Sequence, residues 1–142
     1  MCIRDRVIHY SNSYGDKKFS TELAKLIYIA KSKRIKVFII APVPTYDVHI
    51  PQTMFYDAGN KEALSLTRER HLDKTQTFQK FVDSFKNSEI EVYDPSEFLC
   101  NSEVGCLIST VDSKPYYFDS NHLTLTGASL LKPLFDRLLS RI

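Results

Sequence analysis

The fold of this chain is decided by residues 35–44, which read IKVFIIAPVP. The first seven of these form a nearly continuous apolar run with several β-branched side chains. A run of this kind is typical of a strand that is covered on both faces, as in a parallel sheet. Pro42 and Pro44 should end the strand, because proline cannot donate a hydrogen bond to the ladder.

Helices and strands alternate on either side of this strand. Apolar side chains recur at helical spacing in residues 17–33, in one or two helices over residues 61–87, and in a last helix over residues 123–142. Residues 7–10 and 90–93 predict short strands, and residues 96–100 predict one helical turn. The order strand, helix, strand, helix, strand, helix predicts an α/β domain with a parallel sheet and helices on both faces.

Finer features of these helices can also be predicted. The packing face of the first helix should include Leu26 and Ile27. Thr124 or Thr126 can cap the last helix, since a threonine hydroxyl accepts a hydrogen bond from a backbone N–H of the first turn. Pro133 lies inside the helical pattern and should kink it.

A long irregular stretch, residues 45–60, follows the central strand. In an α/β domain such a loop often borders the functional site. Its aromatic residues Tyr46, Phe55 and Tyr56 either line a pocket for an acyl group or a sugar, or fold the loop onto the core. His49 in the same loop either approaches the site or is solvated.

Length and charge limit the classes of function. The 142 residues suit one domain with a hydrophobic core. The 19 basic and 17 acidic residues leave a net charge of +2, which is too balanced for a nucleic-acid or membrane-surface footprint. No apolar run approaches the roughly 20 residues that span a bilayer.

The start of the chain does not look like part of a domain. Residues 1–6 read MCIRDR, which resembles a translated sequencing adapter at the start of many unrelated reading frames. We therefore expect residues 7–142 to form the domain and Cys2 to lie outside it.

The other two cysteines, Cys100 and Cys106, have five residues between them. Zinc sites usually use closer cysteine pairs and a second pair of ligands, which the sequence lacks. The spacing favours a small disulfide loop, formed in an oxidising compartment, over the alternative of two unpaired buried thiols.

The chemistry of the chain points to residues 117–128, which read YFDSNHLTLTGA. Asp119 and His122 lie three residues apart, just before the last helix. An aspartate that orients a histidine, with the histidine as general base, is the supporting half of a nucleophilic hydrolase site. Because D-x-x-H is a short pattern, the alternative is a turn aspartate beside a surface histidine.

These residues resemble the closing block of the SGNH hydrolase superfamily, in which D-x-x-H completes a Ser-His-Asp triad. The pattern HLTxxGA and the preceding cysteine pair look most like the periplasmic SGNH domain of O-antigen acetylase-type membrane O-acyltransferases. Residues 35–44 and the segment EVYDP at residues 91–95 are similar to that branch in the same order. The resemblance covers roughly residues 7–142, as the C-terminal portion of such a domain.

The resemblance implies a flavodoxin-like, three-layer α/β/α fold. It also implies a serine esterase or O-acyltransferase for acyl esters, acetyl above all, of cell-surface glycans. Asp119 would be the triad acid and His122 the general base, with no metal ion or organic cofactor. The implied partners are an acyl donor, a glycan acceptor and a fused membrane acyltransferase domain, and the implied location is the periplasm.

The chain departs from the family pattern at its nucleophile. The family's serine lies in a Gly-Asp-Ser block on the first strand, whereas Lys17 follows Gly15 and Asp16 here. Asn12 lies near the place of the oxyanion-hole asparagine, but its flanks match poorly and a loop asparagine is the simpler interpretation. We therefore expect an N-terminally truncated domain that lacks its serine and is inactive alone.

Two other classes of protein fit the sequence. A non-catalytic α/β binding or interaction module would use the same cleft without covalent chemistry. A redox or metal protein built on Cys100 and Cys106 would need free thiolates.

Overall fold

The computed structural model describes residues 17–56, 62–85 and 90–141. The chain divides into two compact units. Among the described residues, the sheet unit consists of residues 17–42, 74–85 and 90–93. The site unit consists of residues 43–56, 62–73 and 94–141. The predicted strands at residues 35–41 and 90–93 belong to the first unit, and the predicted active-site pair belongs to the second. The strand predicted at residues 7–10 lies outside the described residues.

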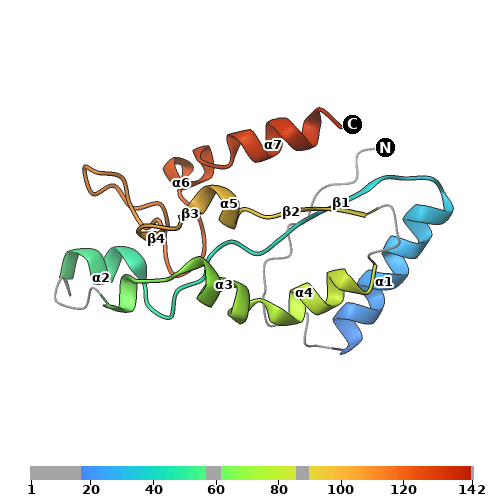
Figure 1. The fold of residues 1–142 in the computed structure, drawn as a ribbon, viewed down its shortest axis with the longest axis horizontal. Coiled ribbons are helices and arrows are strands. Elements are labelled where there is room, and N and C mark those ends of the chain that lie inside the picture. Colours follow the sequence, from blue (N-terminus) through green and yellow to red (C-terminus); the bar gives the residue numbers. More distant parts are fainter. Residues whose placement is uncertain (1–16, 57–61, 86–89, 142) are drawn as a thin grey trace. The chain divides into compact units, whose positions relative to one another are not determined.

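The sheet unit contains two parallel strands (Figure 1). β1, Val37–Ile40, pairs with β2, Ile90–Tyr93, and Val37 lies opposite Ile90. Both strands lie where the apolar patterns predict them. The described chain therefore has a mixed α/β architecture with a small parallel sheet.

Burial in the sheet unit is less complete than the sequence predicts. All four residues of β1 are half-buried, so the expected cover on both faces is not present within the described residues. α1, Lys17–Ser32, forms as predicted and lies beside β1. The predicted packing face is correct at Ile27, which is buried, and wrong at Leu26, which is 63% exposed. Successive residues of a helix point about 100° apart, so a narrow contact with one strand buries only one of this pair.

Three short helices form in the helical segment predicted after the long loop. η2, Glu62–Leu64, is a single 3₁₀ turn, and α3 is Arg68–Lys74. α4, Gln76–Asp83, belongs to the sheet unit and buries Phe78 and Phe81. The apolar residues at helical spacing therefore predict helix correctly, but not the points at which it is interrupted.

The site unit is built from short elements around one core. α2, Ile50–Tyr56, forms within residues 45–60, so the prediction of an irregular stretch is wrong for this part. α5, Ser96–Leu99, is the single helical turn that the sequence predicts. β3, Cys100–Asn101, and β4, Gly105–Cys106, form a small antiparallel pair. The buried core consists of Val43, Tyr46, Ile50, Leu66, Leu99, Cys100, Cys106, Tyr117 and Leu131.

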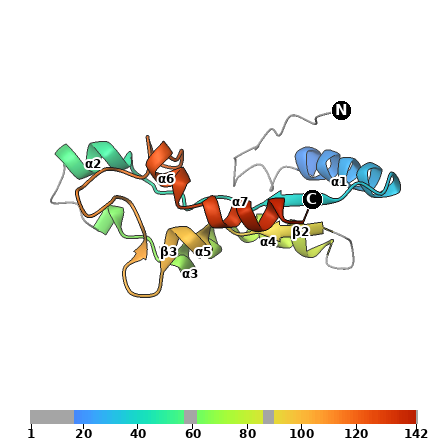
Figure 2. The same ribbon diagram turned by 90° about the horizontal axis from the view of Figure 1, so that it is seen from above.

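The last helical segment is two helices, α6, Leu125–Ser129, and α7, Lys132–Leu139, joined by a bend (Figures 1 and 2). Pro133 occupies the first turn of α7. Proline suits that position, because its missing N–H would have no intrahelical acceptor there and its φ is already helical. The kink predicted at Pro133 is thus corrected to a break just before it, at Leu130 and Leu131.

Thr124 caps α6 and fastens its start to the preceding segment. Its hydroxyl accepts a hydrogen bond from the Gly127 N–H at 3.1 Å and donates one to the Pro115 carbonyl at 3.0 Å. The backbone of Gly127 packs directly against the backbone of Tyr116. A Cβ at position 127 would lie only 2.1 Å from the Tyr116 carbonyl oxygen. Of the two predicted caps, Thr124 is therefore the correct one, and Thr126 is exposed.

Replacing Thr124 by alanine should lower the free energy of unfolding by about 1–2 kcal/mol, because it removes the cap and a hydroxyl that also bonds Pro115. Urea denaturation of the whole chain measures this loss. The matched control is T126A, which removes the same group from an exposed position of α6 and should change stability by less than about 0.5 kcal/mol. Equal losses for the two variants would contradict the role of Thr124.

Candidate active site

Asp119 and His122 lie on a tight loop just before α6. The base of the loop is closed by an antiparallel bridge between Tyr117 and Leu123. Inside the bridge, the Phe118 N–H donates to the His122 carbonyl at 2.7 Å. Within this closed loop the Asp119 and His122 side chains are in contact.

Both carboxylate oxygens of Asp119 are engaged. Oδ2 lies 2.7 Å from Nδ1 of His122. Oδ1 accepts the backbone N–H groups of Asn121 and His122, each at 2.9 Å. The two backbone bonds fix the carboxylate within the loop, and Oδ2 is thereby aimed at the ring.

These hydrogen bonds keep the carboxylate ionised. Partial burial alone would raise the pKa of Asp119. The N–H groups of Asn121 and His122 and the imidazole outweigh burial and lower the pKa from 3.8 to about 2. Because an ionised carboxylate can only accept, the ring proton is assigned to Nδ1, and in the neutral ring the lone pair lies on Nε2.

The imidazole is open to solvent. The side chain of His122 is 63% exposed, and that of Asp119 is 38% exposed. Within residues 17–56, 62–85 and 90–141, no serine, threonine or cysteine side chain hydrogen-bonds to this ring. The exposed ring can therefore be reached by a reacting group that is not bound to it in this structure.

The loop after β1 contacts this site, as the sequence predicts. The Tyr46 N–H donates to the Ser120 carbonyl at 2.9 Å, and the Ile50 N–H donates to the Asp119 carbonyl at 3.3 Å. Both bonds end on the tip of the Asp119/His122 loop. A segment about 70 residues earlier in the chain thus fixes the backbone that carries the aspartate.

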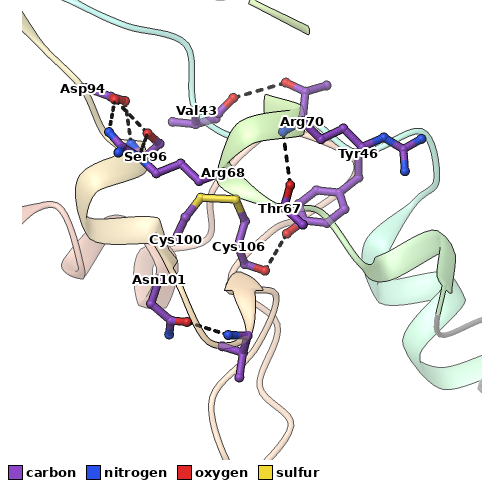
Figure 3. Close-up of a disulfide and its surroundings, with 12 residues drawn as sticks. Val43, Tyr46, Thr67, Arg68, Arg70, Asp94, Ser96, Cys100, Asn101 and Cys106 are labelled. Carbon is purple, nitrogen blue, oxygen red and sulfur yellow. Dashed lines mark hydrogen bonds and ion pairs between the residues drawn. A yellow bond between two sulfur atoms is a disulfide. The ribbon is translucent and has the colours of Figure 1, made fainter. Parts of the chain in front are cut away.

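Cys100 and Cys106 form the predicted disulfide, which joins β3 to β4 (Figure 3). The Tyr46 hydroxyl donates to the Cys106 carbonyl at 2.9 Å. The Cys106 N–H donates to the Leu66 carbonyl at 2.7 Å. Gly105 lies at φ +79°, where a Cβ would be 2.6 Å from the same Leu66 oxygen. The turn between the strands therefore needs glycine both for its backbone angle and for this close approach.

Comparison with known families decides the broader identity. The sequence matches the family described as SGNH domain (fused to AT3 domains) over residues 4–137. The chain belongs to this SGNH domain family. No curated protein and no solved structure matches it. The family assignment confirms the resemblance that residues 117–128 carry.

Family membership indicates the kind of larger protein in which such a domain occurs. SGNH domains of this family are fused to membrane AT3 (acyltransferase 3) domains, and the family implies a flavodoxin-like fold. In the part of this SGNH chain that the structure describes, no helix is both long and apolar enough to cross a membrane.

A half-buried polar network in this SGNH domain was not predicted from the sequence. Arg68 donates to the Ser96 hydroxyl at 3.1 Å and to the Asp94 carboxylate at 3.0 Å (Figure 3). Asp94 also accepts the Ser96 N–H at 2.8 Å. The network ties α3 to α5. Its sequence signal is the Asp94-Pro95-Ser96 turn, since aspartate often accepts the N–H two residues later.

Among the described residues, none of the other side chains singled out in the sequence hydrogen-bonds to the Asp119 or His122 side chain. Tyr46 is buried in the core, whereas Phe55 and Tyr56 are 60% and 87% exposed. His49 is exposed, and its Nδ1 accepts the Gln52 N–H at 3.4 Å. Asn12, the weak oxyanion-hole candidate, falls outside the described residues.

Two clefts of the site unit lie near the disulfide. The larger, of about 490 Å³, is mainly apolar and includes Met54, Leu64 and Cys106 in its lining. The other, of about 420 Å³, is polar and includes Arg68 and Cys100. Asp119 and His122 line neither of them. The exposed Asp119/His122 pair therefore lies outside both of these clefts.

The depressed pKa of Asp119 predicts how stability responds to acid. The folded-state value of about 2 lies below the ordinary 3.8, so the stabilisation is complete above about pH 4 and is lost as the pH falls towards 2. D119N should destabilise the chain at neutral pH and flatten the decline of its melting temperature across this window. D136N is the control, because Asp136 forms only an exposed ion pair with Lys132. A melting curve of D119N that follows the unmodified chain through the window would contradict the prediction.

Proposed function

We propose that this SGNH domain belongs to a serine esterase or O-acyltransferase in which Asp119 is the triad acid and His122 the general base. The observation that carries the proposal is the 2.7 Å contact between Asp119 Oδ2 and His122 Nδ1, with Oδ1 held by two backbone N–H groups. An exposed ring with an oriented Nδ1 is what a general base requires. A turn aspartate beside a surface histidine would also accept the two backbone N–H groups, but it would not require Oδ2 to be aligned with Nδ1 of the ring.

The serine would come from a Gly-Asp-Ser block, which this sequence does not contain. We therefore propose that this chain is the C-terminal part of the domain and that the complete domain is a three-layer α/β/α sandwich. The small parallel sheet and the family assignment support this fold.

The residues of this chain would move one proton in each of two steps. His122 Nε2 takes the proton of the serine hydroxyl as the serine oxygen bonds to the acyl carbon. Asp119 stays ionised and stabilises the imidazolium, which then gives the proton to the departing alkoxide. In the second step His122 takes a proton from water or a sugar hydroxyl, which attacks the acyl-serine, and returns it to the serine oxygen. The cycle requires neither a metal ion nor an organic cofactor.

The domains to which the family is fused support the proposed substrates. Fusion to membrane AT3 domains supports an acyl donor, acetyl above all, and a cell-surface glycan as acceptor. It also supports a periplasmic location for the domain, where the Cys100–Cys106 disulfide would persist. Nucleic acid is not a proposed partner, because the net charge is only +2. A redox or metal function of the cysteines is not proposed either, since both sulfurs are bonded to each other.

Hydrolysis of a chromogenic acetyl ester tests the proposal. The 142-residue chain should hydrolyse it no faster than its H122A variant. The same domain, extended upstream of Val7 with the native sequence through a Gly-Asp-Ser block, should be active. In that longer protein, H122A and D119N should each lower kcat by about 10³-fold or more.

The matched control is H49A, which removes another exposed histidine of the site unit and should leave kcat unchanged. Fast, His122-dependent hydrolysis by the 142-residue chain would contradict the absence of the nucleophile. Full activity of H122A in the extended protein would contradict the role of His122. Glycan binding without turnover in the extended protein would instead support the non-catalytic binding module.

A further inference from the structure

Tyr46 connects two features that lie far apart in the sequence. Its side chain is only 4% exposed, and its hydroxyl donates to the carbonyl of Cys106, which is 60 residues away. Its backbone N–H donates to the carbonyl of Ser120 at 2.9 Å. One residue therefore holds the disulfide loop through its side chain and the Asp119/His122 loop through its backbone.

The ring of Tyr46 also contacts the base of the Asp119/His122 loop. It meets the ring of Tyr117 edge-on, with the ring centres 5.5 Å apart. Tyr117 forms the closing bridge of that loop with Leu123. A shift of the Tyr46 ring would thus disturb the loop at its base as well as at its tip.

We infer that Tyr46 is a positioning residue for the proposed triad: it ties the Asp119/His122 loop to the disulfide loop, so that the Tyr46 hydroxyl sets the alignment of the two catalytic side chains. The inference rests on the proposed function for its catalytic meaning. The mechanical link does not, because it follows from the hydrogen bonds alone.

A hydroxyl at this position is needed for the link. The aromatic ring by itself would fill the same core space, but it would leave the Cys106 carbonyl without its donor and the ring free to shift. Tyr117 offers the matched comparison. It is fully buried beside Tyr46, yet its hydroxyl has no hydrogen-bond partner among the described residues. Removing that hydroxyl deletes a buried polar group without breaking a bond.

The test is nuclear magnetic resonance of the whole chain without substrate, comparing the variants Y46F and Y117F. Carboxyl carbon shifts follow the ionisation of Asp119, and ring nitrogen shifts report which nitrogen of His122 carries the proton. In Y46F, the pKa of Asp119 should rise from about 2 towards 3.8, and the ring nitrogens should move towards exchange between the two tautomers. In Y117F, both signals should stay as in the unmodified chain.

A lower melting temperature of Y46F with unchanged Asp119 and His122 signals would overturn the inference, because Tyr46 would then serve the core alone. Equal shifts in Y46F and Y117F would also overturn it, since they would reflect the loss of any buried hydroxyl. If Y46F does not fold, C100A/C106A applies the same test from the disulfide end. That variant should shift both signals in the same direction, and unchanged signals would refute the link.

The outcome separates this inference from the proposed function. The signals of Asp119 and His122 are read in the absence of any ester, so they do not depend on catalysis. Catalysis by His122 with unchanged signals in Y46F would leave the triad intact and remove only the role of Tyr46. Altered signals in Y46F, together with full activity of H122A in the extended protein, would support the positioning role of Tyr46 and contradict the catalytic role of His122.

Discussion

The carboxylate of Asp119 accepts hydrogen bonds from two backbone N–H groups and an imidazole, all within four residues of chain. Every donor is local, so the pair depends on the shape of this loop, whose tip is held by the Tyr46 and Ile50 N–H groups. The direction in which the ring projects is not local. It depends on the bridge between Tyr117 and Leu123 before α6 and on the Thr124 cap at its start. The candidate site is therefore a short self-contained loop whose orientation is set by its neighbours.

Features that depend on neighbours along the chain could be predicted from the sequence. The strands Val37–Ile40 and Ile90–Tyr93 and the turn Ser96–Leu99 follow from local apolar pattern and proline placement. The cap at Thr124 follows from hydroxyl chemistry at the helix start. The Asp119/His122 contact is expected from the D-x-x-H pattern, and it is local because both side chains lie on one short loop.

Features that depend on partners elsewhere could not be predicted. A strand pattern does not say how many neighbours cover it, so the half-exposure of β1 and the exposure of Leu26 were not foreseen. The bond from Tyr46 to Cys106 spans 60 residues, and the Arg68–Asp94 pair spans 26. Nothing in the local sequence around either residue indicates which distant group it meets. The break before Pro133 has a different cause, because proline is compatible with either a kink or a helix start.

In the site unit, the loop that carries Asp119 and His122 is held largely by residues outside regular helices and strands. Sites on helices and strands are usually held more accurately than sites on loops. Here the loop at residues 118–122 is held by bonds to two other segments. The Tyr46 and Ile50 N–H groups hold its tip, and the Tyr116 N–H bonds the Ile108 carbonyl at 2.8 Å, two residues beyond the disulfide. The disulfide closes residues 100–106, so one covalent link includes Cys106 on the first path and lies two residues before Ile108 on the second. The loop that carries Asp119 and His122 is thus held by backbone hydrogen bonds to irregular segments, one of which is cross-linked next to the bonded residues.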